Sequence, residues 1–135
     1  MAVVSTDLMI IERSGVLYKT PVSALPPDAA ILINARTTTS YTLVLADAGK
    51  KITSSNAATQ IVTIPTNASV AFPVGTVLGV TQIGAGVLSV KGATGVTVNG
   101  LSAGTVAIIA RWTGITLTKL ATDTWLAEGN VGAAT

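Results

Sequence analysis

Apolar and polar residues alternate over many short stretches of this chain, and this alternation is the strongest structural signal in the sequence. In "QIVTIP" (60–65) and "GVTVN" (95–99), apolar β-branched residues stand two positions apart, Val62 and Ile64 in the first and Val96 and Val98 in the second. Side chains two residues apart share one face of a β-strand, so each stretch is typical of a strand with one buried face. No stretch repeats apolar residues at the spacing of an α-helix. The pattern therefore predicts an all-β protein.

Turn-forming residues separate the short apolar runs. Asp-Ala-Gly, Ser-Asn-Ala, Pro-Thr-Asn, Gly-Ala-Gly, Asn-Gly and Asp-Thr recur at intervals of roughly 8–12 residues. This spacing is typical of sandwiches and barrels, and we predict a compact β-sandwich or barrel-like domain of short antiparallel strands. The expected strands span residues 30–35, 41–46, 51–54, 60–65, 69–73, 76–83, 87–91, 95–99, 105–112, 115–120 and 124–129.

Two of these runs depart from simple alternation. "TVAIIARW" (105–112) places Ile108 directly before Ile109, which indicates a strand covered on both faces. "TVLGVTQI" (76–83) carries Gly79 in its middle, and a glycine there favours a β-bulge or a close approach of another backbone. Either a simple bulge or a contact between subunits near a symmetry axis satisfies this pattern.

The first 29 residues differ from the rest. "DLMIIERSGVLYKT" (7–20) predicts two short β runs about the turn dipeptide Ser14-Gly15. Pro26-Pro27 then interrupts any regular element, because proline lacks an N–H and restricts the residue before it. We therefore predict an N-terminal arm with a proline-rich elbow over residues 1–29, followed by the β domain over residues 30–135.

The composition changes this picture by pointing to partners. Hydrophobic residues make up 49% of the 135 residues and charged residues only 10%, against roughly 25% charged residues in ordinary soluble domains. A chain of this length buries only about two-thirds of its unfolded surface, so much apolar side chain would remain exposed on a monomer. We expect this surface to be buried against other subunits; the alternative is a soluble monomer rich in Ala and Val.

Several function classes are disfavoured by residues that the sequence lacks. It contains no His and no Cys, which removes His-dependent nucleophilic catalysis, thiolate chemistry and disulfides. The carboxylates lie in turns or in the arm, where they usually bind backbone N–H groups: Asp7, Glu12, Asp28, Asp47, Asp123 and Glu128. We therefore predict no catalytic residue, no metal and no cofactor.

Nucleic-acid and membrane partners are not expected either. The net charge is +2, and no basic run is longer than Lys50-Lys51, whereas nucleic-acid binding needs several basic residues on one face. No apolar stretch approaches the length of about 18 residues that spans a bilayer.

Two features leave alternatives open. The glycine-rich "GAGVLSVKG" (84–92) lacks the third glycine of a dinucleotide-binding loop, because Ser89 stands at that position, and a hairpin turn is the better interpretation. The aromatic residues Tyr18, Tyr41, Trp112 and Trp125 could present a stacking face for a sugar. Scattered aromatics in a β domain are more often core or interface anchors.

Several phrases of the sequence, taken in order, resemble a β-rich domain that recurs in structural proteins of tailed bacteriophages. The resemblance is carried by "YTLVLADAGK" (41–50), "VTIPTNASVAFPVGT" (62–76), "QIGAG" (82–86), "GVTV" (95–98) and "DTWLAEGN" (123–130). Residues 5–25 also resemble the short N-terminal segment of many small phage virion proteins. The ranges over which these segments are spread, residues 5–25 and 41–130, cover about four-fifths of the chain. The resemblance implies a non-enzymatic structural protein, made in the host cytoplasm and located on the virion, that forms a homotrimer.

Within that resemblance, a short arm before a single β domain favours a capsid decoration (cement) protein that binds the major capsid protein or another virion protein. We hypothesise that the arm pairs edge-on with such a partner. Its anchors would be Leu8, Ile10, Val16 and Tyr18, and Arg13 and Lys19 would face polar groups. The predicted trimer interface comprises Val70, Phe72, Val74 and Val80.

A second hypothesis is a short tail-fibre or tail-tip module that recognises a glycan on the host cell surface. Exposure of Tyr41, Trp112 or Trp125 beside polar turn residues would favour it. A third, a polysaccharide depolymerase, lacks the pair of carboxylates that glycoside hydrolysis requires.

Overall fold

The computed structural model describes the backbone of residues 8–13 and 16–21, and residues 30–135 with their side chains. The chain divides into two units, Met1–Ala30 and Ile31–Thr135. In the first unit, strands β1 (Leu8–Arg13) and β2 (Val16–Pro21) form an antiparallel hairpin. The two short strands predicted for the arm are therefore present.

The second unit is built almost entirely of β-strands, which confirms the predicted all-β class. Its regular elements are β3 (Ile33–Arg36), β4 (Ser40–Thr42), the short 3-10 turn η2 (Leu45–Asp47), β5 (Lys51–Ser54), β6 (Gln60–Ile64), β7 (Val77–Gln82), β8 (Leu88–Gly92), β9 (Thr97–Val98), β10 (Leu101–Ser102), β11 (Thr105–Ala107), β12 (Thr113–Ala121) and β13 (Thr124–Gly129).

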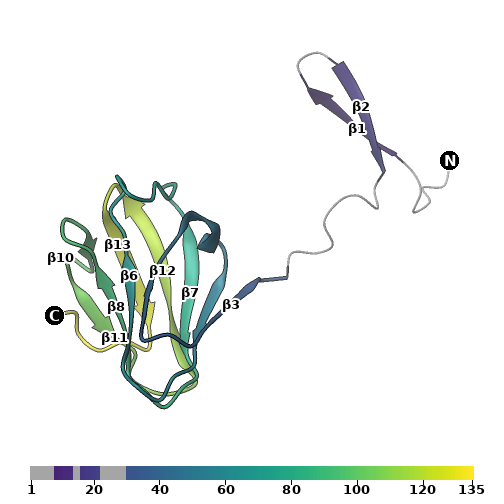
Figure 1. Cartoon of the computed structure of the whole chain (residues 1–135). Coiled ribbons are helices and arrows are strands. Elements are labelled where there is room, and N and C mark those ends of the chain that lie inside the picture. The colour runs from purple at the N-terminus through teal and green to yellow at the C-terminus, as the bar shows by residue number, and fades with distance from the viewer. Residues whose placement is uncertain (1–7, 14–15, 22–29) are drawn as a thin grey trace. The chain divides into compact units, whose positions relative to one another are not determined.

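These strands form two sheets that face each other as layers (Figure 1). The seven-stranded sheet has the order β10-β9-β13-β12-β7-β5-β3, and the four-stranded sheet has the order β11-β8-β6-β4. From β3 to β8 the chain crosses from one sheet to the other after every strand. A chain that crosses to the opposite layer and returns runs in its original direction, so successive strands within each sheet are parallel.

The prediction of antiparallel strands is therefore wrong for this half of the domain. β5 is parallel to both β3 and β7, and β6 is parallel to both β4 and β8. Only from β8 onward do antiparallel pairs dominate, with β12 lying antiparallel to both β7 and β13. The alternation of side chains shows which face of a strand is buried, but it carries no information about strand direction.

The loops that connect the two sheets stack on one another at one end of the domain. The Ser55 N–H donates to the Arg36 carbonyl at 2.8 Å, and the Ile83 N–H donates to the Ser54 carbonyl at 2.9 Å. A Cβ added at Gly86 would overlap the backbone of Ala58. "GAG" (84–86) is thus a crossing between sheets and not the predicted hairpin turn, and its glycines let adjacent loops touch.

The hydrophobic core lies between the two sheets. Trp125 fills its centre and meets Phe72 edge-to-face, with ring centroids 5.5 Å apart. The other large side chains buried there come from both layers: Leu43, Ile52, Val62, Ile64, Leu78, Val80, Leu88, Val90, Val96, Val98, Val106, Ile108, Ile115 and Leu117.

Three predicted strands differ clearly in extent from the structure. The run over 41–46 is a strand only up to Thr42, and Leu45–Asp47 form the 3-10 turn η2. Residues 69–73 form no strand, yet Phe72 there is buried against Trp125. The predicted strand over 105–112 ends at Ala107. Beyond it Ile108 is buried and Ile109 is 63% exposed, so the two adjacent isoleucines reflect ordinary alternation at a strand end rather than burial on both faces.

Gly79 does not form the predicted bulge. The register of β7 with its neighbours β5 and β12 is continuous through Gly79. The irregularity in this sheet lies instead in β12, between Lys119 and Ala121. Gly79 leaves a gap on the surface of the sheet and leaves the ladder unbroken.

Polar residues close the β3–β4 end of the core. The buried Asp47 carboxylate accepts hydrogen bonds from the Tyr41 hydroxyl and the Asn34 amide, both at 2.7 Å, and from the Val44 N–H at 2.9 Å. The Arg36 guanidinium lies 3.8 Å from the centroid of the Tyr41 ring. This polar layer covers the last apolar layer of the stack, as terminal repeats do in solenoid proteins.

Candidate functional site

The outer face of the seven-stranded sheet carries the most distinctive surface of the domain. On β7, Leu78 and Val80 point into the core, so Gly79 and Thr81 point outward. Across the sheet, Gly79 is paired with Lys51 on β5 and with Thr116 on β12. Thr116 is in turn paired with Glu128 on β13. A lysine and a glutamate therefore lie on one row, with a glycine and a threonine between them.

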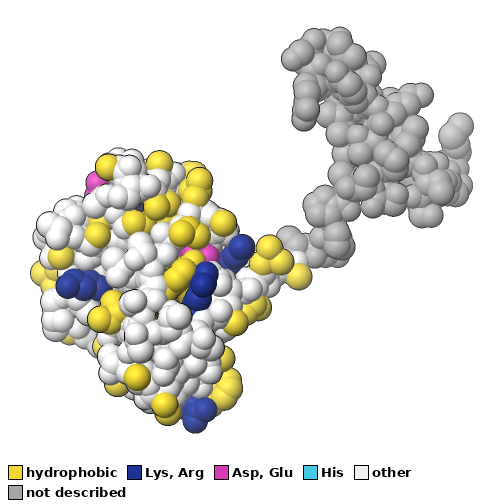
Figure 2. All heavy atoms as spheres, viewed as in Figure 1, with side chains coloured by type: hydrophobic (Ala, Val, Ile, Leu, Met, Phe, Trp, Pro, Cys, Tyr) yellow, Lys and Arg dark blue, Asp and Glu magenta, His cyan; other side chains and the backbone are white. Residues whose placement is uncertain are grey.

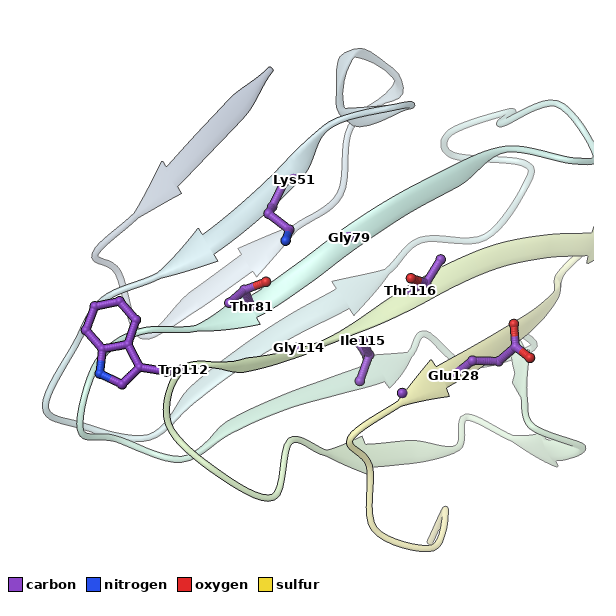
Figure 3. A pocket seen from close by; sticks show the side chains of 9 residues that line it. Lys51, Gly79, Thr81, Trp112, Gly114, Ile115, Thr116 and Glu128 are labelled. Carbon is purple, nitrogen blue, oxygen red and sulfur yellow. The ribbon is translucent and has the colours of Figure 1, made fainter. Parts of the chain in front are cut away.

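The missing side chains on this face create a shallow groove of about 270 Å³. Figure 3 shows its lining, with Trp112 at one end and Glu128 at the other. The groove is lined by Lys51, Gly79, Thr81, Trp112, Gly114, Ile115, Thr116, Glu128 and Gly129.

Trp112 is the exposed aromatic residue of this groove. Its side chain is 70% exposed, and its φ of 64° is a left-handed conformation that non-glycine residues rarely adopt. The Trp112 N–H donates to the Gln82 carbonyl at 2.7 Å. Arg111 Nε donates to the Ile83 carbonyl at 2.8 Å, and its guanidinium lies 5.5 Å from the indole centroid. These bonds attach the loop to the end of β7 and hold an indole and a cation beside the groove.

A second hollow, of about 420 Å³, adjoins the first and shares Lys51, Gly79 and Thr116 with it. Its edge is apolar. Ile31, Leu32 and Ile33 are 67%, 64% and 59% exposed, and Val77 beside them is 46% exposed. We call Ile31, Leu32, Ile33 and Val77 the β3-edge patch. In Figure 2, hydrophobic side chains gather where the chain enters the β domain.

Asp123 and Lys119 have structural partners inside the domain, whereas Arg36 Nε is buried without a hydrogen-bond partner among the described residues. Asp123 accepts a hydrogen bond from the Asn67 N–H at 2.5 Å. The buried Lys119 donates from Nζ to the Asn67 side-chain oxygen at 2.5 Å and to the Phe72 carbonyl at 2.7 Å. As expected for turn carboxylates, Asp47 and Asp123 bind backbone N–H groups.

Tyr41 is the described residue whose ionisation the fold clearly alters. Burial, followed by the hydrogen bond to Asp47, raises the pKa of the Tyr41 hydroxyl above its ordinary value. The phenol therefore stays protonated and keeps donating to Asp47 at physiological pH.

The predicted trimer interface is only partly on the surface. Phe72 and Val80 are 3% and 0% exposed within their own domain, so assigning them to a contact between subunits was wrong. Val70 is half-buried against the core, and Val74 is 64% exposed. The pattern of β-branched and aromatic residues indicated correctly that Phe72 and Val80 are buried. It did not show whether they are buried in their own domain or against another subunit.

The six predicted arm residues share a different outcome. They lie on β1 and β2, whose side chains are outside the described part of the structure, so their role stays a prediction: Leu8, Ile10, Arg13, Val16, Tyr18 and Lys19.

The aromatic residues divide between the two interpretations that the sequence left open. Trp125 is a core residue and Tyr41 is half-buried in the polar layer, whereas Trp112 is exposed beside polar groups. The side chain of Tyr18 is outside the described residues. The groove has no local signature in the sequence, because its glycines and threonines belong to three different strands, β7, β12 and β13. Only the neighbouring Arg111-Trp112 pair, at the end of an apolar run, was a local signal.

The groove offers charged, hydroxyl and aromatic groups that can bind a ligand. It presents one carboxylate, one ammonium group, two threonine hydroxyls and one indole. Among the described residues, no three His, Cys, Asp or Glu side chains lie close enough to hold a metal ion. The described residues also contain no helix long and apolar enough to cross a membrane. No protein-family model matches the chain, and no curated protein matches its sequence.

Proposed function

We propose that this protein is a non-enzymatic structural protein of a tailed-bacteriophage virion, and that it acts as a homotrimeric decoration or cement protein on the capsid. Two things support the proposal. The first is the resemblance carried by the phrases between residues 41 and 130. The second, and the observation that carries the binding role, is the β3-edge patch.

The β3-edge patch combines two properties that favour association. Among the described strands β3 is the last of its sheet, with β5 on one side, so its other side offers a strand from another chain N–H and C=O groups that no described strand pairs. Ile31 and Ile33 on the same edge each expose more than half of their surface. Burying such a side chain contributes roughly 1.5–3 kcal/mol. In the proposed trimer, each copy covers this edge of its neighbour.

The trimer is tested by light scattering on the full chain at micromolar concentration. We expect a mass of three chains for the wild type and of one chain for the double variant Ile31→Asp, Ile33→Asp. Ile109→Asp is the matched control, because Ile109 is 63% exposed but lies in the loop before β12. A wild-type chain that remains a monomer would contradict the proposal.

The position on the virion needs a separate test. Antibodies against residues 30–135 are expected to label the heads of intact particles by immunogold electron microscopy. Deleting residues 1–20 is expected to abolish binding of the purified protein to undecorated capsids, since the arm supplies the proposed capsid contact. Label confined to the tail would contradict a decoration role, and undiminished binding of the truncated chain would remove the arm from the mechanism.

The exposed Trp112 beside a polar groove favours a second candidate function, a tail-fibre or tail-tip module that recognises a cell-surface glycan. Large exposed aromatic residues present a flat apolar face, and one beside hydrogen-bonding groups suits the apolar and hydroxyl faces of a sugar ring. Labelling at the tail, together with binding in a glycan screen, would favour this function over the first.

A further inference from the structure

We propose that the groove on the seven-stranded sheet binds a saccharide that carries a carboxylate, with Trp112 stacking on a sugar ring and the cations Arg111 and Lys51 holding the acid. The inference rests on the second candidate function and gives it a ligand class and a site. It does not depend on the decoration role.

Trp112 is a large apolar residue that is exposed to solvent. An indole in water costs free energy that its burial would recover, and this one is 70% exposed in a left-handed backbone conformation. Two hydrogen bonds fix the loop that presents it, from the Trp112 N–H to Gln82 and from the Arg111 side chain to Ile83. The indole is therefore held on the surface, ready to contact a ligand without first ordering its loop.

The surface beside the indole is hollowed. Gly79 has no side chain, the Thr81 hydroxyl packs against Gly114, and the Thr116 hydroxyl stands on the neighbouring strand (Figure 3). A flat ring can lie on such a floor with its apolar face on Trp112 and its hydroxyls within reach of the threonines. A volume of about 270 Å³ suits a short saccharide segment rather than a large folded partner.

Charged residues are distributed unevenly around the groove. The Arg111 guanidinium lies 5.5 Å from the Trp112 ring centroid, and Lys51 projects into the groove from β5 with its stem over Gly79. Glu128 stands at the opposite end (Figure 3). Adjacent strands are about 4.8 Å apart, so the backbones of Lys51 and Glu128 are separated by roughly 14 Å across the sheet. An acidic ligand group is therefore attracted to the side of the groove that holds Arg111 and Lys51 and repelled from the side of Glu128, which gives the bound saccharide a direction.

Binding by the full chain to matched oligosaccharides tests this inference. One probe contains glucuronic acid, and the other has glucose in its place with the same linkages. We expect the acidic probe to bind at least about tenfold more tightly, which corresponds to about 1.4 kcal/mol. Raising the salt concentration should weaken its binding more than that of the neutral probe, because a contact at an exposed groove is screened.

Variants then assign the site. Trp112→Ala is expected to lower the affinity for the acidic probe by about tenfold or more, as for an aromatic anchor. Lys51→Met should remove most of the preference for the acidic probe over the neutral one. Lys91→Met is the matched control, because Lys91 is an exposed lysine on the four-stranded sheet, and it should change neither affinity. Thermal unfolding of each variant verifies that the domain remains folded.

The possible failures are distinguishable. Equal binding of the two probes, or unchanged binding by Trp112→Ala, overturns this inference while leaving glycan recognition in place. Absence of binding to any glycan in a broad array overturns both the inference and the second candidate function.

Discussion

The two faces of the seven-stranded sheet use the same strands but different kinds of residue. Inward, β7 and β12 present Leu78, Val80 and Leu117, which fill space against the opposite sheet. Outward, the same strands present Gly79 and Thr116, which leave space open. The two faces of one strand are therefore under different constraints. Inner residues are constrained by volume because they share a closed core, whereas outer residues are free to create a binding surface.

Residues of the same type occur both buried inside the domain and in the groove, so matched substitutions can compare the two environments. The pairs are Trp125 and Trp112, Gly86 and Gly79, and Lys119 and Lys51. In each pair the first member is buried and the second is in the groove.

The largest contrast is expected between the tryptophans. Trp125→Ala should lower the free energy of unfolding by about 3–5 kcal/mol, because it leaves a cavity beside Phe72. Trp112→Ala should change it by less than about 0.5 kcal/mol, as for an exposed residue. Urea unfolding followed by circular dichroism measures both values. Comparable losses from the two variants would mean that Trp112 supports the fold and that the two faces do not differ as described.

The glycines should give the next contrast. In Gly86→Ala the new methyl group meets the Ala58 backbone in the loop stack, and we expect a loss of about 1–3 kcal/mol. In Gly79→Ala the methyl would lie 3.4 Å from Lys51 Cε, an ordinary contact. Stability should then stay within about 0.5 kcal/mol of the wild type, while the groove becomes shallower. A melting temperature for Gly86→Ala that equals the wild-type value would show that the loops do not need their close approach.

The lysines should differ by a smaller amount. Lys119→Met leaves the Phe72 carbonyl and the Asn67 side-chain oxygen without this donor, but it also removes a buried charge, so we expect a net loss of about 1–2 kcal/mol. Lys51→Met should have no measurable effect on stability. Chemical denaturation of both variants makes the comparison, and a more stable Lys119→Met protein would show that burying this charge costs more than its hydrogen bonds contribute.

The smallest effect concerns pH and the polar layer around Asp47. Because the pKa of Tyr41 is raised in the folded protein, the unfolded chain loses this proton first as the pH rises. The contribution of Tyr41 is therefore fully present below the ordinary tyrosine pKa of about 10 and is lost as the pH rises through the folded-state pKa. Tyr41→Phe should cost about 1 kcal/mol at neutral pH and show a smaller alkaline loss of stability than the wild type.

Urea titrations at several pH values between neutrality and the alkaline range measure this dependence. Tyr18→Phe, in the arm, is the matched control and should keep the full alkaline loss. An identical alkaline loss in Tyr41→Phe would mean that other groups cause it.

The sequence predicted much of the fold from local pattern. The strands β5, β6, β7, β8 and β13 lie within one residue of their expected bounds, because each has regular alternation and flanking turn formers. The run at 69–73 was misassigned, since a valine and a phenylalanine two residues apart look the same in a strand and in a loop that inserts Phe72 into the core. Of the candidate site, the sequence singled out Trp112 among four aromatics, and it named Gly79 and Glu128 for other reasons, but it gave no sign that these residues share one groove.

The sequence by itself determined that the chain forms short strands, which face of each strand is apolar, and that it lacks the histidines and cysteines on which much catalysis depends. Only the tertiary structure decided which strands run parallel and which valines are internal. It also decided that Lys51, Gly79, Thr116 and Glu128 share one row. The physical reason is range: alternation and turn formation depend on neighbours along the chain, whereas strand direction, register and the groove depend on which distant segments pack together.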